Sequence, residues 1–177
     1  PVAALLCVPK VFGLMMMNNI VEMGYSSIPT DIEEGQSLVY VNGPGFPALY
    51  SRILSITKEE IEPTEVLILS AAFDANLIVR GSHSLDIELS EGWFADMLFL
   101  ESSQSYFVGE RVQRLGIESI VQTVNSEKIP TQVQFVFKEP IHSDHYRWMK
   151  WMGDHYEEFE LPTEEGAKLY IPDPWNF

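Results

Sequence analysis

Three histidines and two aspartates lie close together near the carboxyl end of the chain, and these residue types can bind a transition metal. They are His142, Asp144, His145, Asp154 and His155. On a helix, His145 and His155 would lie about 80° from a common face at roughly 100° per residue. No two histidines have the i, i+4 spacing that places both imidazoles on one helix face. The spacing therefore predicts neither a bound metal nor another cofactor.

Other arrangements that enzymes use lack part of their signature. Cys7, the single cysteine, lies in an apolar run of an acidic chain, which disfavours a reactive thiolate and predicts a buried structural residue. The segment 42–45 (Asn-Gly-Pro-Gly) has neither the lysine nor the Ser/Thr of a phosphate-binding loop, so it indicates a turn. Adjacent glutamates such as Glu59 and Glu60 are more typical of a solvated face than of a glycosidase. The sequence favours a protein that is not an enzyme.

Aromatic and acidic residues alternate in the last part of the chain, a pattern typical of a protein-binding surface. Trp and Tyr concentrate binding energy at interfaces, and surrounding charges set orientation and association rate. The predicted partner-binding residues are Trp151, Glu157, Glu158, Glu164, Glu165, Trp175 and Phe177. The alternative interpretation, that the aromatic and apolar residues form core, suits Trp148 and Met152 better.

The charges are unevenly distributed. The chain has 26 acidic residues against 11 Lys and Arg, which gives a formal net charge of −15. Residues 103–150 hold five acids and six bases, whereas residues 151–177 hold seven acids and only Lys168. A field of this sign repels nucleic acids and anionic membranes and attracts basic molecules. We therefore expect a basic protein partner and neither nucleic-acid nor membrane binding.

Length and composition indicate a globular chain of 177 residues with 46% hydrophobic residues. We expect a single domain, 1–177, with residues 142–177 as a candidate acidic, aromatic-rich appendage. One cysteine allows no disulfide within the chain, and the apolar stretch 2–21 is interrupted by Pro9, Lys10 and two asparagines. Together with the lack of a signal-peptide pattern, this favours a cytoplasmic location. Pro1 fits either a removed initiator methionine or a fragment boundary.

Strand patterns outnumber helix patterns. Alternation and short apolar runs predict strands at 3–8, 37–41, 65–73, 77–80, 85–89, 117–124, 131–138 and 167–171, with a further apolar run at 96–101. Helical spacing of apolar residues predicts helices at 10–24, 48–56, 106–115 and 144–159. Because strands and helices do not alternate regularly, we expect an α+β fold with a single mixed, mainly antiparallel sheet and two to four packed helices.

One segment resembles a known family. Residues 96–100 (Asp-Met-Leu-Phe-Leu) and 106–120 (Tyr-Phe-Val-Gly-Glu-Arg-Val-Gln-Arg-Leu-Gly-Ile-Glu-Ser-Ile) are similar to the closing segment of the DUF1629-type (Imm11-like) bacterial immunity proteins. That segment has a short strand, a hydrophobic-Val-Ser-Glu-Arg helix start and a Leu-Gly turn into a strand. Here Gly109 replaces the serine. The resemblance implies an intracellular antidote that binds and blocks a cognate toxin, and many such toxins are basic.

The leading prediction is an acidic, non-enzymatic binding protein that sequesters or inhibits a basic protein. A small-ligand-binding or catalytic domain with a cleft near His142–His155 is the first alternative. A phage or virion structural protein is the second, because the composition suits it equally well. The sequence favours no particular oligomeric state.

Overall fold

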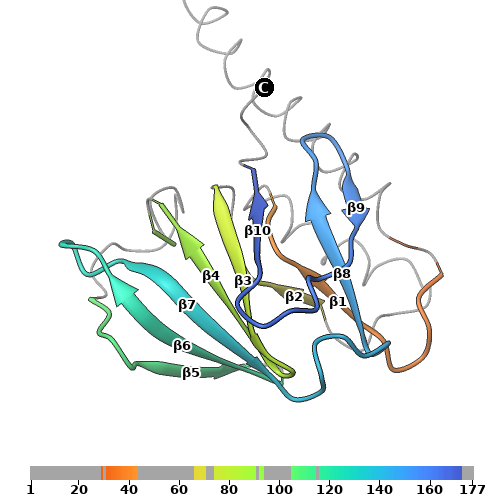
Figure 1. Ribbon diagram of the computed structural model, residues 1–177, viewed down its shortest axis with the longest axis horizontal. Helices are drawn as coiled ribbons and strands as arrows, with labels where there is room; N and C mark the ends of the chain where they lie inside the picture. The colour runs from red at the N-terminus through yellow and green to blue at the C-terminus, as the bar shows by residue number, and fades with distance from the viewer. Residues whose placement is uncertain are drawn as a thin grey trace, which may run out of the picture.

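The computed structural model describes residues 29, 31–43, 66–70, 74–90, 92–93, 105–114 and 116–172. Within these ranges the chain forms ten strands and no helix, arranged as two sheets (Figure 1). The expected α+β fold, with one sheet and two to four helices, is therefore wrong for the described part of the chain, which is all-β. The helices expected at 10–24 and 48–56, the strand at 3–8 and the apolar run at 96–101 lie outside the described residues, as does Cys7.

The larger sheet is antiparallel throughout, in the order β10-β3-β4-β7-β6-β5. Its strands are β3 (Ala75–Gly81), β4 (Ser84–Leu89), β5 (Arg111–Arg114), β6 (Ile117–Val124), β7 (Pro130–Phe137) and β10 (Lys168–Ile171). Apolar and polar residues alternate along β4 and β7, so one face of the sheet carries Leu85, Ile87 and Phe135 into the core. The strands predicted at 85–89, 117–124 and 131–138 are confirmed.

The smaller sheet has the order β2-β1-β8-β9. Its strands are β1 (Ser37–Tyr40), β2 (Val66–Ile68), β8 (Tyr146–Trp151) and β9 (Tyr156–Glu158). β1 runs parallel to both of its neighbours, and it pairs with β8 although about a hundred residues separate them in the sequence. β9 returns antiparallel to β8 and forms the edge of this sheet. Residues 146–171 are thus built into the two sheets through β8, β9 and β10.

The main core lies between the two sheets and takes residues from both. Phe137 of the larger sheet contacts Tyr146 and Trp148 of the smaller one, with ring centroids 5.2 and 5.4 Å apart. The indole N–H of Trp148 donates to the carbonyl of Ile141 at 2.9 Å, which satisfies its one polar atom inside the core. A second buried cluster lies on the opposite face of the smaller sheet and includes Leu38, Tyr40, Met149, Trp151 and Tyr156.

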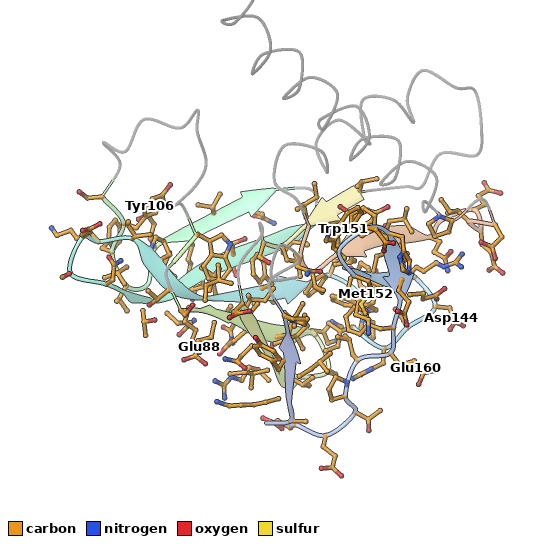
Figure 2. All side chains as sticks on the ribbon, turned by 90° about the horizontal axis from the view of Figure 1, so that it is seen from above. Glu88, Tyr106, Asp144, Trp151, Met152 and Glu160 are labelled. Carbon is orange, nitrogen blue, oxygen red and sulfur yellow. The ribbon has the colours of Figure 1, made fainter. Side chains whose placement is uncertain are left out.

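The helix expected at 144–159 is wrong, because these residues form the β8–β9 hairpin. Both faces of β8 are buried, so apolar residues follow one another along it without the simple alternation of a half-exposed strand. Gly153, with φ of 106°, reverses the chain in a backbone conformation that suits glycine. Met152 lies at this turn with 44% of its surface exposed, so the expectation that it belongs to the core is also wrong (Figure 2).

The helix expected at 106–115 is wrong as well. Residues 107–110 form a turn in which the N–H of Glu110 donates to the carbonyl of Phe107 at 3.1 Å. Gly109 adopts φ of 87°, and Gly109 and Glu110 both bond to Val121 of β6, which is the pattern of a G1 β-bulge. The chain then continues as β5, which pairs with β6 through the hairpin ending at Gly116. The Val108/Val112 spacing that suggested a helix therefore spans a turn and an exposed edge strand.

Candidate protein-binding surface

Trp151, one of the three aromatic residues predicted to bind a partner, is part of the second buried cluster. Only 1% of its surface is exposed, and its ring packs edge to face against Tyr156 at 4.8 Å between centroids (Figure 2). Tyr156 in turn contacts Tyr40 at 4.5 Å. Burial of this kind raises the pKa of both tyrosine hydroxyls well above the usual value. Trp151 is thus unavailable to a partner in this structure, and Trp175 and Phe177 lie outside the described residues.

The position of the β8–β9 hairpin depends on one buried amide. The side chain of Asn42, which follows β1, accepts a hydrogen bond from the N–H of Trp151 at 2.7 Å and donates to its carbonyl at 3.4 Å. Asn42 therefore continues the pairing of β1 with β8 beyond the last ladder residue. Ser70 at the end of β2 donates to the carbonyl of Val41, which satisfies another buried polar group beside it. The segment expected to be a plain turn thus begins with a residue that fixes the hairpin.

The acidic residues predicted to meet a partner do lie on the surface. Glu157 and Glu158 of β9 and Glu164 and Glu165 of the connection from β9 to β10 are all exposed, and so is Glu160 between them. We call this set the acidic connection. Between residues 151 and 172, Lys168 is the only Lys or Arg, but the neighbouring β8 places Arg147 against Glu158 and pairs Lys150 with Glu157 in the strand ladder. Because β9 is an edge strand and Glu160 lies beside it (Figure 2), a partner could approach without displacing a neighbouring described strand.

Arg147 neutralises one member of the acidic connection. Its guanidinium contacts the carboxylates of Glu158 and Asp31, each at 2.8 Å. The hydrogen bond from Arg147, then a backbone hydrogen bond of Asp31 itself, and then the charge of Arg147 lower the pKa of Asp31 below the ordinary value of 3.8. Burial lowers the pKa of Arg147, but the hydrogen bonds and charges of the two carboxylates raise it by more. This network joins the segment before β1 to β8 and β9, and it leaves Glu157, Glu160, Glu164 and Glu165 as the freer acids.

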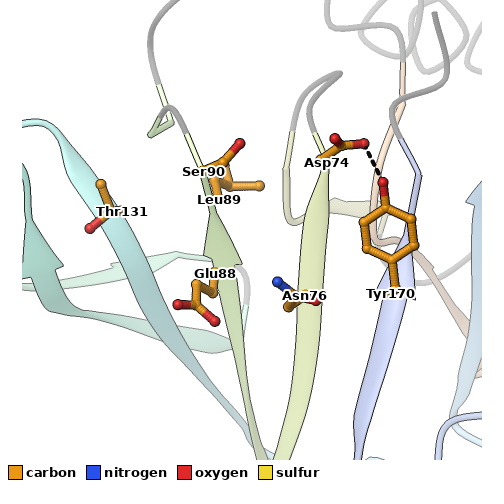
Figure 3. A pocket seen from close by; sticks show the side chains of 7 residues that line it. All are labelled: Asp74, Asn76, Glu88, Leu89, Ser90, Thr131 and Tyr170. Carbon is orange, nitrogen blue, oxygen red and sulfur yellow. Dashed lines mark hydrogen bonds between the residues drawn. The ribbon is translucent and has the colours of Figure 1, made fainter. Parts of the chain in front are cut away.

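A polar cavity of about 470 Å³ opens at the ends of β10, β3, β4 and β7 (Figure 3). Its lining includes Asp74, Asn76, Glu88, Leu89, Ser90, Thr131 and Tyr170. The hydroxyl of Tyr170 donates to Asp74 at 2.8 Å, while the ring remains largely exposed. Two of the described lining residues are acids and none is a base, so the cavity suits an ammonium or guanidinium group. This cavity could not be predicted from the sequence, because its lining depends on which strands become neighbours in the sheet.

Of the two acidic residues of β4, one is buried and the other is half-exposed. Asp86 retains 3% of its surface, and its Oδ2 accepts hydrogen bonds from Arg80 Nε and Gln132 Nε2, both at 2.7 Å. This carboxylate is therefore an internal partner of Arg80 and does not contribute to a binding surface. Glu88, two residues further along β4, remains half-exposed at the cavity.

The histidines near the carboxyl end do not form a common site. His145 precedes β8 and contacts Ser37 Oγ at 3.3 Å, whereas His155 follows the turn at the other end of β8 and pairs with Asp154 at 2.5 Å. A six-residue strand is about 20 Å long, so these imidazoles cannot meet at one metal. Among the described residues, no group of three or more His, Cys, Asp or Glu has the arrangement of a metal site. His142 is exposed in the loop before β8.

Comparison of the chain with protein-family models, with curated proteins and with solved structures gave no match. The described ranges also contain no helix of the length and hydrophobicity needed to cross a lipid bilayer.

Proposed function

We propose that this chain is a non-enzymatic binding protein whose acidic connection receives a basic protein partner. The observation that carries the proposal is the exposure of Glu157, Glu160, Glu164 and Glu165 along an edge strand and the loop that follows it. Exposed charges of one sign steer an oppositely charged partner and raise its association rate by roughly 10- to 1,000-fold. The acidic cavity at β10 adds a place for one cationic side chain of that partner.

β10 joins the acidic connection to the cavity, whose other lining residues lie in or beside β3, β4 and β7. Glu164 and Glu165 lie in the loop that leads into β10, and Tyr170 of β10 reaches the cavity wall. A lysine or arginine side chain that entered the cavity would find the carboxylates of Asp74 and Glu88 and the exposed ring of Tyr170, which favours a cation over its face. The steering charges of Glu164 and Glu165 are thereby assigned to the start of β10, and recognition of one cationic side chain to its end. The resemblance of residues 96–120 to immunity proteins implies a toxin as this partner, although a turn and β5 stand here where that family's segment begins a helix.

The test begins with a pull-down from the native host, followed by surface-binding kinetics with the captured basic protein. Changing Glu157, Glu158, Glu164 and Glu165 together to Gln should lower the association rate by roughly tenfold at low salt and leave the dissociation rate nearly unchanged. Raising the salt concentration should lower the association rate of the unchanged protein to a similar extent, because exposed charges are screened beyond about 8 Å at physiological ionic strength.

A matched pair of variants separates the acidic connection from net charge. Glu164→Gln with Glu165→Gln and Glu127→Gln with Glu139→Gln remove the same charge, but only the first pair lies in the acidic connection. The first pair should slow association and the second should have little effect. Equal effects of both pairs, or an association rate that ignores salt, would contradict the proposal and leave the acidity as a solubility device.

A further inference from the structure

The outer edge of β5 is a second surface that can bind a partner, and it lies at the opposite end of the molecule from β9 (Figure 1). In the part of the chain that the structure describes, no strand pairs with this side of β5. Three apolar residues are exposed on or beside it: Phe107 (64%), Val108 (61%) and Val112 (43%). Edge strands with exposed apolar residues and free backbone groups are templates for pairing with another strand.

The hydrogen bonds to β6 show which backbone groups of β5 point outward. The carbonyl of Glu110 accepts from the N–H of Val121 at 3.0 Å, so Glu110 directs its backbone toward β6. Backbone groups alternate along an antiparallel strand, and the N–H and C=O of one residue point to the same side. Val112 therefore also bonds toward β6, while Arg111 and Gln113 direct their N–H and C=O groups to the outer edge.

We propose that this edge pairs with the β5 edge of a second copy of the chain, antiparallel and centred on Val112. In this register, Arg111 lies opposite Gln113 of the second copy, and Gln113 lies opposite its Arg111. Both residues of each pair carry outward backbone groups, so each pair exchanges two N–H···O=C hydrogen bonds. Val112 meets Val112 of the second copy at a non-hydrogen-bonded position, where side chains approach most closely. The two six-stranded sheets then join into one.

The distribution of charge favours a second copy of the chain as the partner of β5 and favours this register. Residues 103–128 hold three acids and three bases, so β5 lies in a charge-balanced part of a chain with net charge −15. Two copies of an acidic molecule repel least where each is locally neutral. The register also places Glu110 opposite position 114 of the second copy, which is an arginine in the sequence. Shifting the centre to Arg111 would instead place two arginines directly opposite each other, which is unfavourable.

Single cysteines test the register. In a Cys7→Ser background, the Val112→Cys variant should form a disulfide-linked dimer under mild oxidation, because the two positions face each other at a distance that a disulfide spans. The matched Gln113→Cys variant should cross-link at least tenfold more slowly. The two copies of position 113 each lie one residue from the centre of the pairing and are offset from each other by two residues, which places their Cα atoms beyond the roughly 7 Å that a disulfide allows. Equal cross-linking at both positions would overturn the proposed register.

Sedimentation equilibrium tests the association itself. The weight-average mass should rise with concentration from 20.2 kDa toward twice that value, and the association should strengthen as salt screens the repulsion between the copies. Val112→Lys should abolish it, and Gln113→Pro should as well by removing an outward N–H, whereas Gln113→Ala should not. Circular dichroism checks that each variant is folded. A mass that stays at 20.2 kDa up to millimolar concentration in both low and high salt would overturn the proposal.

Discussion

Arg147 links two carboxylates from distant parts of the chain and is the most densely paired cation of the described surface. Its contacts with Asp31 and Glu158 hold the segment before β1 against the β8–β9 hairpin. The pKa of Asp31 is lowered by the Arg147 hydrogen bond, so the pair stabilises the fold above the unfolded pKa of 3.8. That stabilisation is lost as the pH falls through the lower folded pKa.

Replacing Arg147 with Gln should raise the pKa of Asp31 toward 3.8, because the hydrogen bond and the positive charge are removed together. Carbon-detected NMR titration of the Asp31 carboxyl measures this directly. Arg111→Gln is the control, since Arg111 pairs with Glu118 at the other end of the molecule and should leave Asp31 unchanged. If Asp31 titrates at the same pH in the unchanged protein and in the Arg147 variant, the pairing is absent in solution.

At the scale of elements, β8 carries buried residues on both faces and connects the main core to the second cluster. Met149 lies on the face of Leu38 and Tyr40, whereas Met152, three residues later, lies in the exposed turn. A helix would have placed these two methionines on the same side. In the hairpin, Met149 is buried on one face of β8, and Met152 lies beyond the end of the strand in solvent.

Met149→Ala should therefore destabilise the protein by about 2–5 kcal/mol, the usual cost of removing a buried long side chain. Met152→Ala should cost less than about 0.5 kcal/mol, as expected for an exposed position. Urea unfolding measures the loss of stability in both variants, and the comparison is matched because each removes the same side-chain atoms. Equal losses for the two variants would favour a helical stripe and contradict the hairpin.

Whether a strand could be predicted from the sequence depended on how many of its faces are buried. Strands with one buried face, such as β4 with Leu85, Ile87 and Leu89, show the alternation that identifies them, and they were predicted correctly. β8 has two buried faces and β5 is an exposed edge, so neither has a simple period of two. The exposed acids of the proposed binding surface were recognisable from composition. The burial of Trp151 was not, because it depends on the pairing of β8 with the distant β1.

At the scale of the whole molecule, one core joins the two sheets. Phe137 and Trp148 face each other across this interface with ring centroids 5.4 Å apart. The main core therefore makes the unfolding of either sheet depend on the other. The second cluster, which includes Tyr40, lies on the far face of the smaller sheet.

A double-mutant cycle of Phe137→Leu and Trp148→Leu should show a coupling of about 0.5–1.5 kcal/mol beyond additivity, as found for aromatic pairs in contact. The matched pair Phe137→Leu and Tyr40→Leu should add within about 0.5 kcal/mol, because a sheet separates the two rings. Chemical unfolding followed by tryptophan fluorescence provides all six free energies. Full additivity for Phe137 and Trp148 would mean that the sheets do not pack as described.

Because β1 lies between β2 and the distant β8, the strands cannot all pair at the same time during synthesis of the chain. The antiparallel hairpins β3–β4 and β5–β6 can close as soon as their residues leave the ribosome, because their pairs are local. Asn42, in contrast, waits for Trp151, which is 109 residues away. At a synthesis rate of 5–20 residues per second, that interval lasts roughly 5 to 20 seconds. During this time one side of β1 has no neighbour, and the nascent protein exposes a strand edge that a chaperone would have to shield.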